Sequence, residues 1–134
     1  MRVLIVDDHE VVRRGVRSVL LNQPRYEVCA EAVDGQDAIE KARQFTPDVI
    51  VMDVSMPKLN GLESTQQIRA ILPDSEIVIL SQHESAEMVR QAFKAGARGY
   101  VVKSSIGRDL LVAMDTVSQH LPFFDPSISQ PERA

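Results

Sequence analysis

The chain has 134 residues, and its 15 Lys and Arg against 19 Asp and Glu give a formal net charge of −4. With 44% hydrophobic and 25% charged residues, it has the composition of one soluble globular domain and not of a disordered chain. Its longest unbroken apolar runs, Val3–Val6 and Val49–Met52, are too short to cross a membrane. The single Cys29 excludes an internal disulfide and a Cys-rich zinc site. These features predict a reduced, cytoplasmic compartment, and the acidic balance without a basic block predicts that this chain by itself binds no nucleic acid.

Short apolar runs alternate with helical patterns along the chain. The runs predict short strands, most of them too apolar to be half-exposed, at Arg2–Val6, Tyr26–Ala32, Asp48–Met52, Glu76–Leu80 and Gly99–Val102. Between them, and after the last one, apolar residues recur at a spacing near 3.6, which is typical of amphipathic helices. Five strands alternating with five helices predict a doubly wound α/β fold, in which helices cover both faces of a parallel five-stranded sheet.

Capping signals mark the ends of several predicted helices. Asn60, followed by Glu63 three residues later, has the pattern of a capping box. Asp34 or Gly35 can begin the second helix, and Gly96 can take the left-handed conformation that ends the fourth. These signals agree with the apolar spacing, so they support the same division into elements.

The periodic pattern stops near residue 120. Three of the seven prolines fall in Leu121–Ala134, which we therefore interpret as a C-terminal tail or the start of a linker after one domain of residues 1–120. Phe123, Phe124 and Ile128 can still dock on that domain.

Polar side chains follow four of the five predicted strands. Asp7 and Asp8 follow the first strand, Asp53 the third, Ser81 the fourth and Lys103 the fifth. In open α/β sheets, ligand sites form outside the carboxyl ends of the strands. We therefore expect three carboxylates, a hydroxyl and an ammonium group to meet at one edge of the sheet.

Such a set of groups suits phosphoryl transfer assisted by a divalent metal. Three neighbouring carboxylates repel one another, so they require a cation, and all-oxygen ligands suit Mg²⁺. Lys103 can contact a phosphoryl oxygen and Ser81 can donate a hydrogen bond to another. Asp53 can act as a carboxylate nucleophile that forms an acyl phosphate.

Each of these residues also has an ordinary structural role. Asp7 and Asp8 suit the first turn of a helix, and Ser81 suits a helix N-cap. Asp53 suits a turn, and Lys103 suits the solvated surface. The functional interpretation rests on four separate strand ends that carry complementary groups.

The chain resembles the receiver domain of two-component response regulators over about residues 1–120. The segments that carry the resemblance are Val3–His9, Pro47–Pro57 with Asn60-Gly61, Ile79–Ser81 and Ala95–Lys103. The resemblance implies a flavodoxin-like fold with strand order 2-1-3-4-5. The stretch after Lys103, with Ser104, Ser105 and Leu110, is similar to the NarL/FixJ (LuxR-type) branch.

The resemblance also implies a role for each acidic residue. Asp53 would accept the phosphoryl group from the phosphohistidine of a sensor histidine kinase. Asp8 and Asp53 would bind Mg²⁺ directly, the backbone carbonyl of Ser55 would be a further ligand, and Asp7 would act through a water molecule. The protein would be a phosphoacceptor with only self-catalysed phosphotransfer and dephosphorylation, and not an enzyme that turns over a substrate.

The remaining site residues would form a switch. Lys103 would pair with the phosphoryl group, Ser81 would move toward it, and Tyr100 would be the coupled aromatic residue. The output would be altered protein association and, through a C-terminal helix-turn-helix effector domain that is absent here, control of transcription. The chain would thus be either a truncated regulator or a stand-alone receiver. A regulated homodimer is a further expectation, although Met88 and Leu111, outside the core stripes, are interpreted as scattered surface residues.

Four positions near the expected site qualify the resemblance. Many receivers have proline after the lysine, where this chain has Ser104, and a small residue after the hydroxyl residue, where this chain has Gln82. Gln82 bears on the access of a phosphodonor. His9 and His83 are not expected to be ligands, because Mg²⁺ prefers oxygen.

Three other functions compete with that of a phosphorylated receiver. A phosphatase with an aspartate nucleophile would have a second aspartate two residues further on, but position 55 is Ser. A flavodoxin-like cofactor binder would have a small, polar phosphate loop after the first strand, where this chain has Asp7-Asp8-His9-Glu10. The third is a receiver-like interaction module that works without phosphorylation, which Gln82 leaves open.

Overall fold

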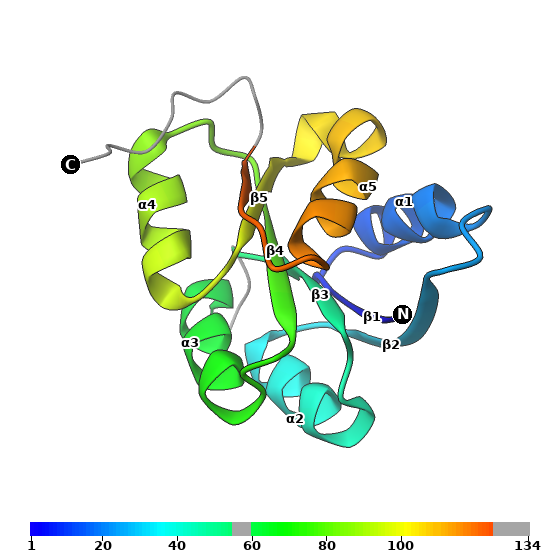
Figure 1. Ribbon diagram of the computed structural model, residues 1–134, viewed down its shortest axis with the longest axis horizontal. Coiled ribbons are helices and arrows are strands. Elements are labelled where there is room, and N and C mark those ends of the chain that lie inside the picture. The colour runs from blue at the N-terminus through cyan, green and yellow to red at the C-terminus, as the bar shows by residue number, and fades with distance from the viewer. Residues whose placement is uncertain (55–59, 125–134) are drawn as a thin grey trace.

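The computed structural model describes residues 1–54 and 60–124 and has one sheet flanked by helices (Figure 1). The strand order is β2-β1-β3-β4-β5-β6, and every pairing is parallel. The elements are β1 (Arg2–Val6), α1 (Glu10–Leu20), β2 (Glu27–Ala32), α2 (Gly35–Phe45), β3 (Val49–Asp53), α3 (Gly61–Ile71), β4 (Glu76–Ser81), α4 (Ala86–Ala95), β5 (Gly99–Val102), a 3₁₀ turn (Lys103–Ser105), α5 (Ile106–Val117) and β6 (Phe123–Phe124).

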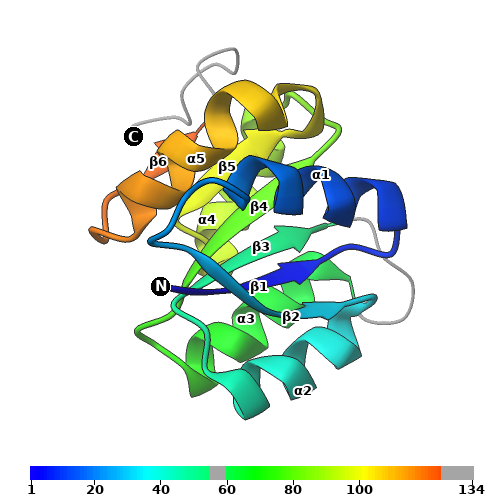
Figure 2. The same ribbon diagram turned by 90° about the vertical axis from the view of Figure 1, so that its right-hand side faces the viewer.

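Helices cover both faces of this sheet, as the apolar strands require. In the two perpendicular views, α1 and α5 lie on one face and α2, α3 and α4 on the other (Figures 1 and 2). The alternation of side chains along each strand supplies two separate cores. Val51 of β3 packs with Leu110 of α5 on one face, whereas Ile50 packs with Ile39 and Ile68 on the other. The predicted doubly wound fold and the order 2-1-3-4-5 are therefore confirmed.

The sheet has one strand more than the sequence pattern predicts. β6 lies beside β5, where the Phe123 amide donates to the Arg98 carbonyl at 3.0 Å. The Phe124 ring meets the Phe93 ring of α4 edge-on, with 6.4 Å between their centroids. Docking covers an otherwise open edge of β5 and partly buries two large rings. Ile128 lies outside the described residues, and a domain boundary near residue 120 stays a prediction.

The capping signals are confirmed. Asn60 Oδ1 accepts from the Glu63 amide at 3.0 Å, and the Glu63 side chain accepts from the Asn60 amide in return. Asp34 caps α2 through the Asp37 amide at 2.8 Å. Gly96 ends α4 with a φ of 115°, a value that only glycine adopts without strain.

Met88 and Leu111 are not scattered surface residues. Met88 is partly buried against the core under α2, α3 and α4, and Leu111 against the core under α1 and α5. The expectation was wrong because both helices present a wider apolar face to the sheet than their core stripes indicate.

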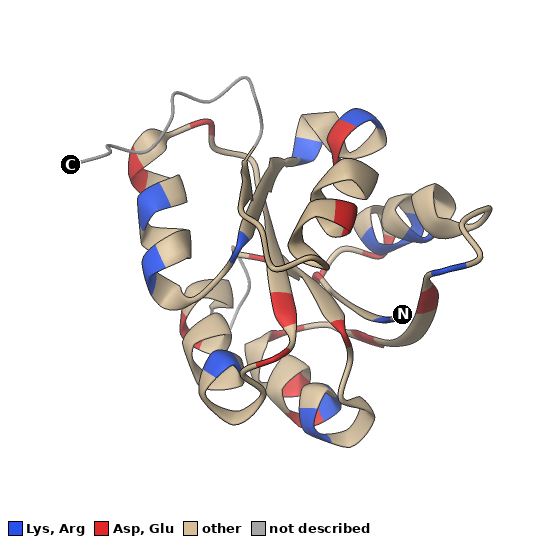
Figure 3. Cartoon of the chain, viewed as in Figure 1, with Lys and Arg blue, Asp and Glu red and all other residues tan. Residues whose placement is uncertain are grey.

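Charges of both signs lie on all five helices, with no helix reserved for basic residues (Figure 3). Among the described residues, no helix has the length and apolar character needed to span a membrane.

Candidate functional site

The carboxyl ends of the parallel strands bring the predicted polar residues to one edge of the sheet. Asp7 and Asp8 follow β1, Asp53 is the last residue of β3, and Ser81 is the last residue of β4. Lys103 begins the 3₁₀ turn directly after β5. Asp53 and Ser81 are thus held by strand pairing, which fixes their backbone more firmly than a loop would.

Lys103 joins two buried carboxylates. Its Nζ lies 3.2 Å from Asp7 Oδ2 and 3.1 Å from Asp53 Oδ1. The side chains of Asp7 and Asp53 are 0% and 1% exposed, and that of Lys103 is 14% exposed. Burial opposes the charge on Lys103, but the hydrogen bonds that its ammonium group donates to Asp53 and Asp7, and the attraction of both carboxylates, outweigh burial and raise the pKa of this group. Lys103 is therefore held as a cation inside the acidic cluster.

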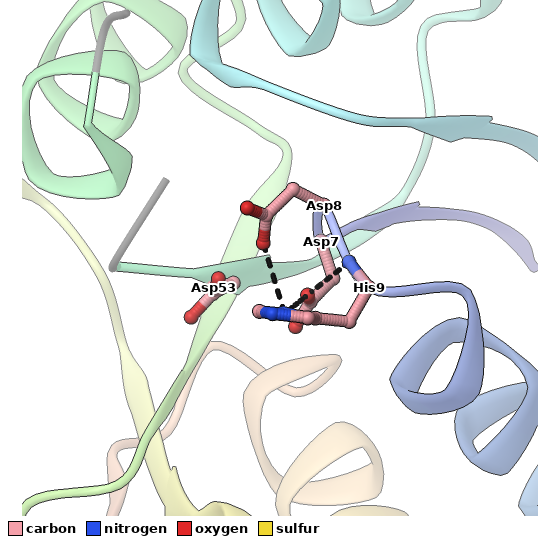
Figure 4. A group of neighbouring side chains, drawn as sticks. All are labelled: Asp7, Asp8, His9 and Asp53. Atoms are coloured by element: carbon pink, nitrogen blue, oxygen red, sulfur yellow. Dashed lines mark hydrogen bonds and ion pairs between the residues drawn. The ribbon is translucent and has the colours of Figure 1, made fainter. Parts of the chain in front are cut away.

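Asp8 and His9 form the more open side of the cluster. The Asp8 side chain is 29% exposed, and His9 Nδ1 lies 3.0 Å from its Oδ1. The same Nδ1 lies 3.1 Å from Asp7 Oδ1. Figure 4 shows the imidazole ring reaching in among the three carboxylates. The sequence interpretation left His9 out, although its place directly after two aspartates was the signal that could have included it.

The cluster fits a divalent metal ion. Asp7, Asp8, His9 and Asp53 each offer a ligand atom, and these atoms lie within 4.8 Å of one another. Asp7 Oδ2 is buried, and within residues 1–54 and 60–124 its contact is with the Lys103 ammonium group at 3.2 Å. Among the described residues one lysine contacts these three carboxylates, which is too little positive charge to balance them, and oxygen ligands of this kind suit Mg²⁺. Ser55, whose carbonyl was expected to be a further ligand, lies outside the described residues.

Ser81 and Tyr100 meet at the loop between β4 and α4. Ser81 Oγ accepts from the His83 amide at 3.0 Å, and Tyr100 Oη donates to the His83 carbonyl at 3.0 Å. Tyr100 is fully buried, and burial raises the pKa of its phenol. The cap of α4 is Ser85, so the alternative interpretation of Ser81 as a helix cap is wrong. Gln82 is exposed.

Two residues that the sequence interpretation did not assign hold the backbone of the site. Arg13 of α1 donates from Nη1 to the Asp7 carbonyl at 2.7 Å and from Nε to Glu31 Oε1 at 2.9 Å, which ties the turn after β1 to β2. At Gly61, a Cβ atom would lie 2.2 Å from the Asp53 carbonyl oxygen. Only glycine allows α3 to begin this close to Asp53.

A family model described as the response regulator receiver domain matches residues 3–115. The chain belongs to this family. This confirms the resemblance found in the sequence. Two curated receiver-containing relatives match over 96% of this chain. They are the transcriptional regulatory protein DegU of Brevibacillus brevis, 36% identical over 129 residues, and the oxygen regulatory protein NreC of Staphylococcus epidermidis, 38% identical over 130 residues.

This receiver spans 55% of DegU and 60% of NreC, so the relatives are longer proteins. Its structure is similar to that of a two-component response regulator of the LuxR family from Aurantimonas sp. SI85-9A1, with 38% identity and a TM-score of 0.91. That similarity covers 97% of this chain and 93% of the other. The predicted NarL/FixJ (LuxR-type) branch is thereby confirmed.

Proposed function

We propose that this receiver accepts a phosphoryl group on Asp53 from the phosphohistidine of a sensor histidine kinase. The observation that carries the proposal is the position of Asp53, a buried carboxylate 3.1 Å from the Lys103 ammonium and beside Asp7 and Asp8. Family membership supports the same function. Lys103 offers the positive charge that a phosphoryl group requires at this position.

The transfer uses the side chains already in place. A carboxylate oxygen of Asp53 forms a bond to phosphorus, while the bond between phosphorus and the kinase histidine nitrogen breaks. The nitrogen leaves with the electron pair of that bond and takes up a proton. Lys103 neutralises negative charge on a phosphoryl oxygen, so the protein contributes mainly positioning and electrostatics. The same groups account for self-catalysed dephosphorylation without turnover of any other substrate.

Asp8 and Asp53 would hold Mg²⁺ directly, with the Ser55 carbonyl as a further ligand and Asp7 acting through water. When bound, the ion neutralises charge on the phosphoryl oxygens and orients them. Asp7 remains paired with Lys103 in this arrangement, because its Oδ2 is the oxygen that faces the ammonium group.

The proposed switch runs from Ser81 to Tyr100. A phosphoryl group on Asp53 adds nearly two negative charges and new acceptor oxygens. Ser81 can donate to one of them, which changes its contact with the His83 amide. Tyr100 donates a hydrogen bond to the His83 carbonyl, so the loop, α4 and β5 can repack together.

The partners and the output complete the proposal. The kinase is the phosphodonor, the phosphorylated receiver changes its protein association, and a homodimer is one form of that change. In a longer protein of the NarL/FixJ type, an effector domain after the receiver would bind DNA and control transcription. The location of this signalling pathway would be cytoplasmic.

Labelling with a small phosphodonor tests the acceptor. Incubated with acetyl phosphate and Mg²⁺, the wild-type chain should gain the mass of one phosphoryl group, and Asp53→Asn should gain none. Asp74→Asn is the matched control, because Asp74 is an exposed aspartate outside the acidic cluster and should leave labelling intact. Equal labelling of wild type and Asp53→Asn would refute Asp53 as the acceptor.

Chelation tests the metal in the same assay. Excess EDTA should abolish the mass gain, and added Mg²⁺ should restore it. Labelling that persists in EDTA would refute the metal role. If wild type gains no phosphoryl group with Mg²⁺ present, the receiver-like interaction module that works without phosphorylation becomes the better interpretation.

A further inference from the structure

His9 occupies an unusual position for the residue that precedes a helix. It is the N-cap of α1, yet its side chain makes no capping hydrogen bond. Its backbone amide instead donates to Asp7 Oδ1 at 2.8 Å, and its Nδ1 contacts that same oxygen at 3.1 Å. The ring is therefore directed away from α1 and toward the acidic cluster (Figure 4).

Nδ1 of His9 contacts two carboxylates at once. It lies 3.1 Å from Asp7 Oδ1 and 3.0 Å from Asp8 Oδ1. Carboxylate oxygens accept hydrogen bonds, so the ring fits here with Nδ1 as the donor. Lys103 contacts Asp7 and Asp53 on the buried side, and His9 contacts Asp7 and Asp8 on the open side. The two residues together satisfy carboxylates that would otherwise repel one another.

We propose that His9 is a displaceable occupant of the cation position, so that a divalent ion must break its contacts in order to bind. This inference rests on the proposed metal role of Asp8 and Asp53. A hard divalent ion is held by carboxylate oxygens and favours them over nitrogen. When Asp8 Oδ1 binds the ion, it no longer accepts the hydrogen bond from His9 Nδ1, so the contact with the ion replaces the contact with the imidazole.

The surroundings of His9 permit this exchange. Its side chain is 63% exposed, so the ring can turn into solvent without opening the core. Lys103 has no such route, because its side chain is only 14% exposed and contacts two buried carboxylates. His9 thereby raises the concentration of divalent ion that is needed to fill the site, whereas Lys103 stays in place for the phosphoryl group.

The test measures metal affinity without phosphorylation. Binding of Mn²⁺ is followed by the loss of the free-ion signal in electron paramagnetic resonance, and Mg²⁺ affinity is obtained by competition at one fixed pH. His9→Ala keeps the backbone amide contact to Asp7 and removes the ring. It should bind both ions roughly threefold to tenfold more tightly than wild type, the factor that one net hydrogen bond contributes.

The control is Gln44→Ala, which removes an exposed polar side chain near the C-terminal end of α2, outside the acidic cluster. Its affinity should equal that of wild type. Unchanged affinity in His9→Ala would overturn the proposal, and weaker affinity would do so by showing that the imidazole is a ligand. If the wild-type chain itself binds neither ion, the metal role in the proposed function is overturned together with this inference. That outcome differs from unchanged or weaker binding by His9→Ala, which would overturn this inference alone.

Discussion

Among single residues, Glu76 is a buried carboxylate whose charge is balanced by neighbouring cationic side chains, unlike the carboxylates of the acidic cluster. It lies at the start of β4, at the other end of the sheet, and its side chain is 2% exposed. Arg69 Nη2 lies 2.8 Å from its Oε1, while Arg98 Nε and His120 Nδ1 lie 3.0 and 2.5 Å from its Oε2. Glu76 is paired with three cationic side chains, so its role is structural, whereas in the acidic cluster the carboxylates outnumber the cations that residues 1–54 and 60–124 supply.

The pKa of Glu76 gives a prediction about acid stability. Burial acts to raise this pKa, but hydrogen bonds from His120, Arg69 and Arg98 outweigh burial and lower it from 4.5. A lowered pKa in the folded state means that the charged form stabilises the fold above about pH 4.5 and that this contribution is lost as the pH falls through the folded value. Glu76→Gln should therefore reduce the free energy of unfolding by about 1–3 kcal/mol at neutral pH.

Urea unfolding at several pH values would measure this effect. The difference between wild type and Glu76→Gln should shrink as the pH falls below the ordinary carboxyl range. Glu87→Gln is the matched control, because Glu87 is an exposed glutamate that also pairs with an arginine, Arg90. It should change stability little at any pH. A difference for Glu76→Gln that stays constant down to acid pH would contradict the assigned ion pairs.

At the scale of elements, β6 is a strand that the local sequence pattern could not predict. Two residues, Phe123 and Phe124, have too little length to display the alternation of a strand, and Pro122 precedes them. The pairing arises because β5 has a free edge and α4 presents Phe93 beside it. By contrast, the five longer strands were predicted to within one residue at each end. Four of them are mostly apolar and buried, whereas β2, at the edge of the sheet, is partly exposed and contains Glu27 and Glu31.

The contribution of β6 to stability can be measured. Phe124→Ala should lower the free energy of unfolding by about 1–2 kcal/mol, because a partly buried ring loses its contacts with Phe93 and the core. Leu121→Ala, at a side chain that is 53% exposed, should cost less. Hydrogen exchange at the Phe123 amide, which donates to Arg98, should become faster in Phe124→Ala. Equal stability of Phe124→Ala and wild type would mean that β6 does not dock in solution.

At the scale of the whole molecule, the net charge of −4 is unevenly distributed. Charges of both signs are interspersed over the helices, but Asp7, Asp8 and Asp53 gather at one edge of the sheet (Figures 3 and 4). The folded state holds them together against their mutual repulsion, whereas the unfolded chain separates them. A cation that binds this edge therefore stabilises the whole fold.

Magnesium should raise the global stability of the domain by mass action. At a Mg²⁺ concentration about 100 times the Kd, the free energy of unfolding should rise by about 2.7 kcal/mol. Asp8→Asn should lose most of this gain, and Asp74→Asn should retain it. Thermal or urea unfolding with Mg²⁺, with EDTA, and with Mg²⁺ restored would measure the effect. An equal gain in Asp8→Asn and wild type would show that the ion stabilises the protein elsewhere.

The sequence by itself determined the order and type of the main elements and the meeting of Asp7, Asp8, Asp53, Ser81 and Lys103 at one edge. It could do so because apolar periodicity is local, and because parallel strands place their carboxyl ends on the same side. Only the tertiary structure decided which groups touch within that edge.

That second part includes Lys103 between two buried carboxylates, His9 turned into the cluster and Tyr100 bonded to the His83 carbonyl. It also includes β6, which pairs with β5 because the packing of α4 and β5 leaves an edge for it. These contacts depend on side-chain direction and on segments far apart in the chain. Neither is encoded in a local pattern, since both emerge only when the sheet and helices pack together.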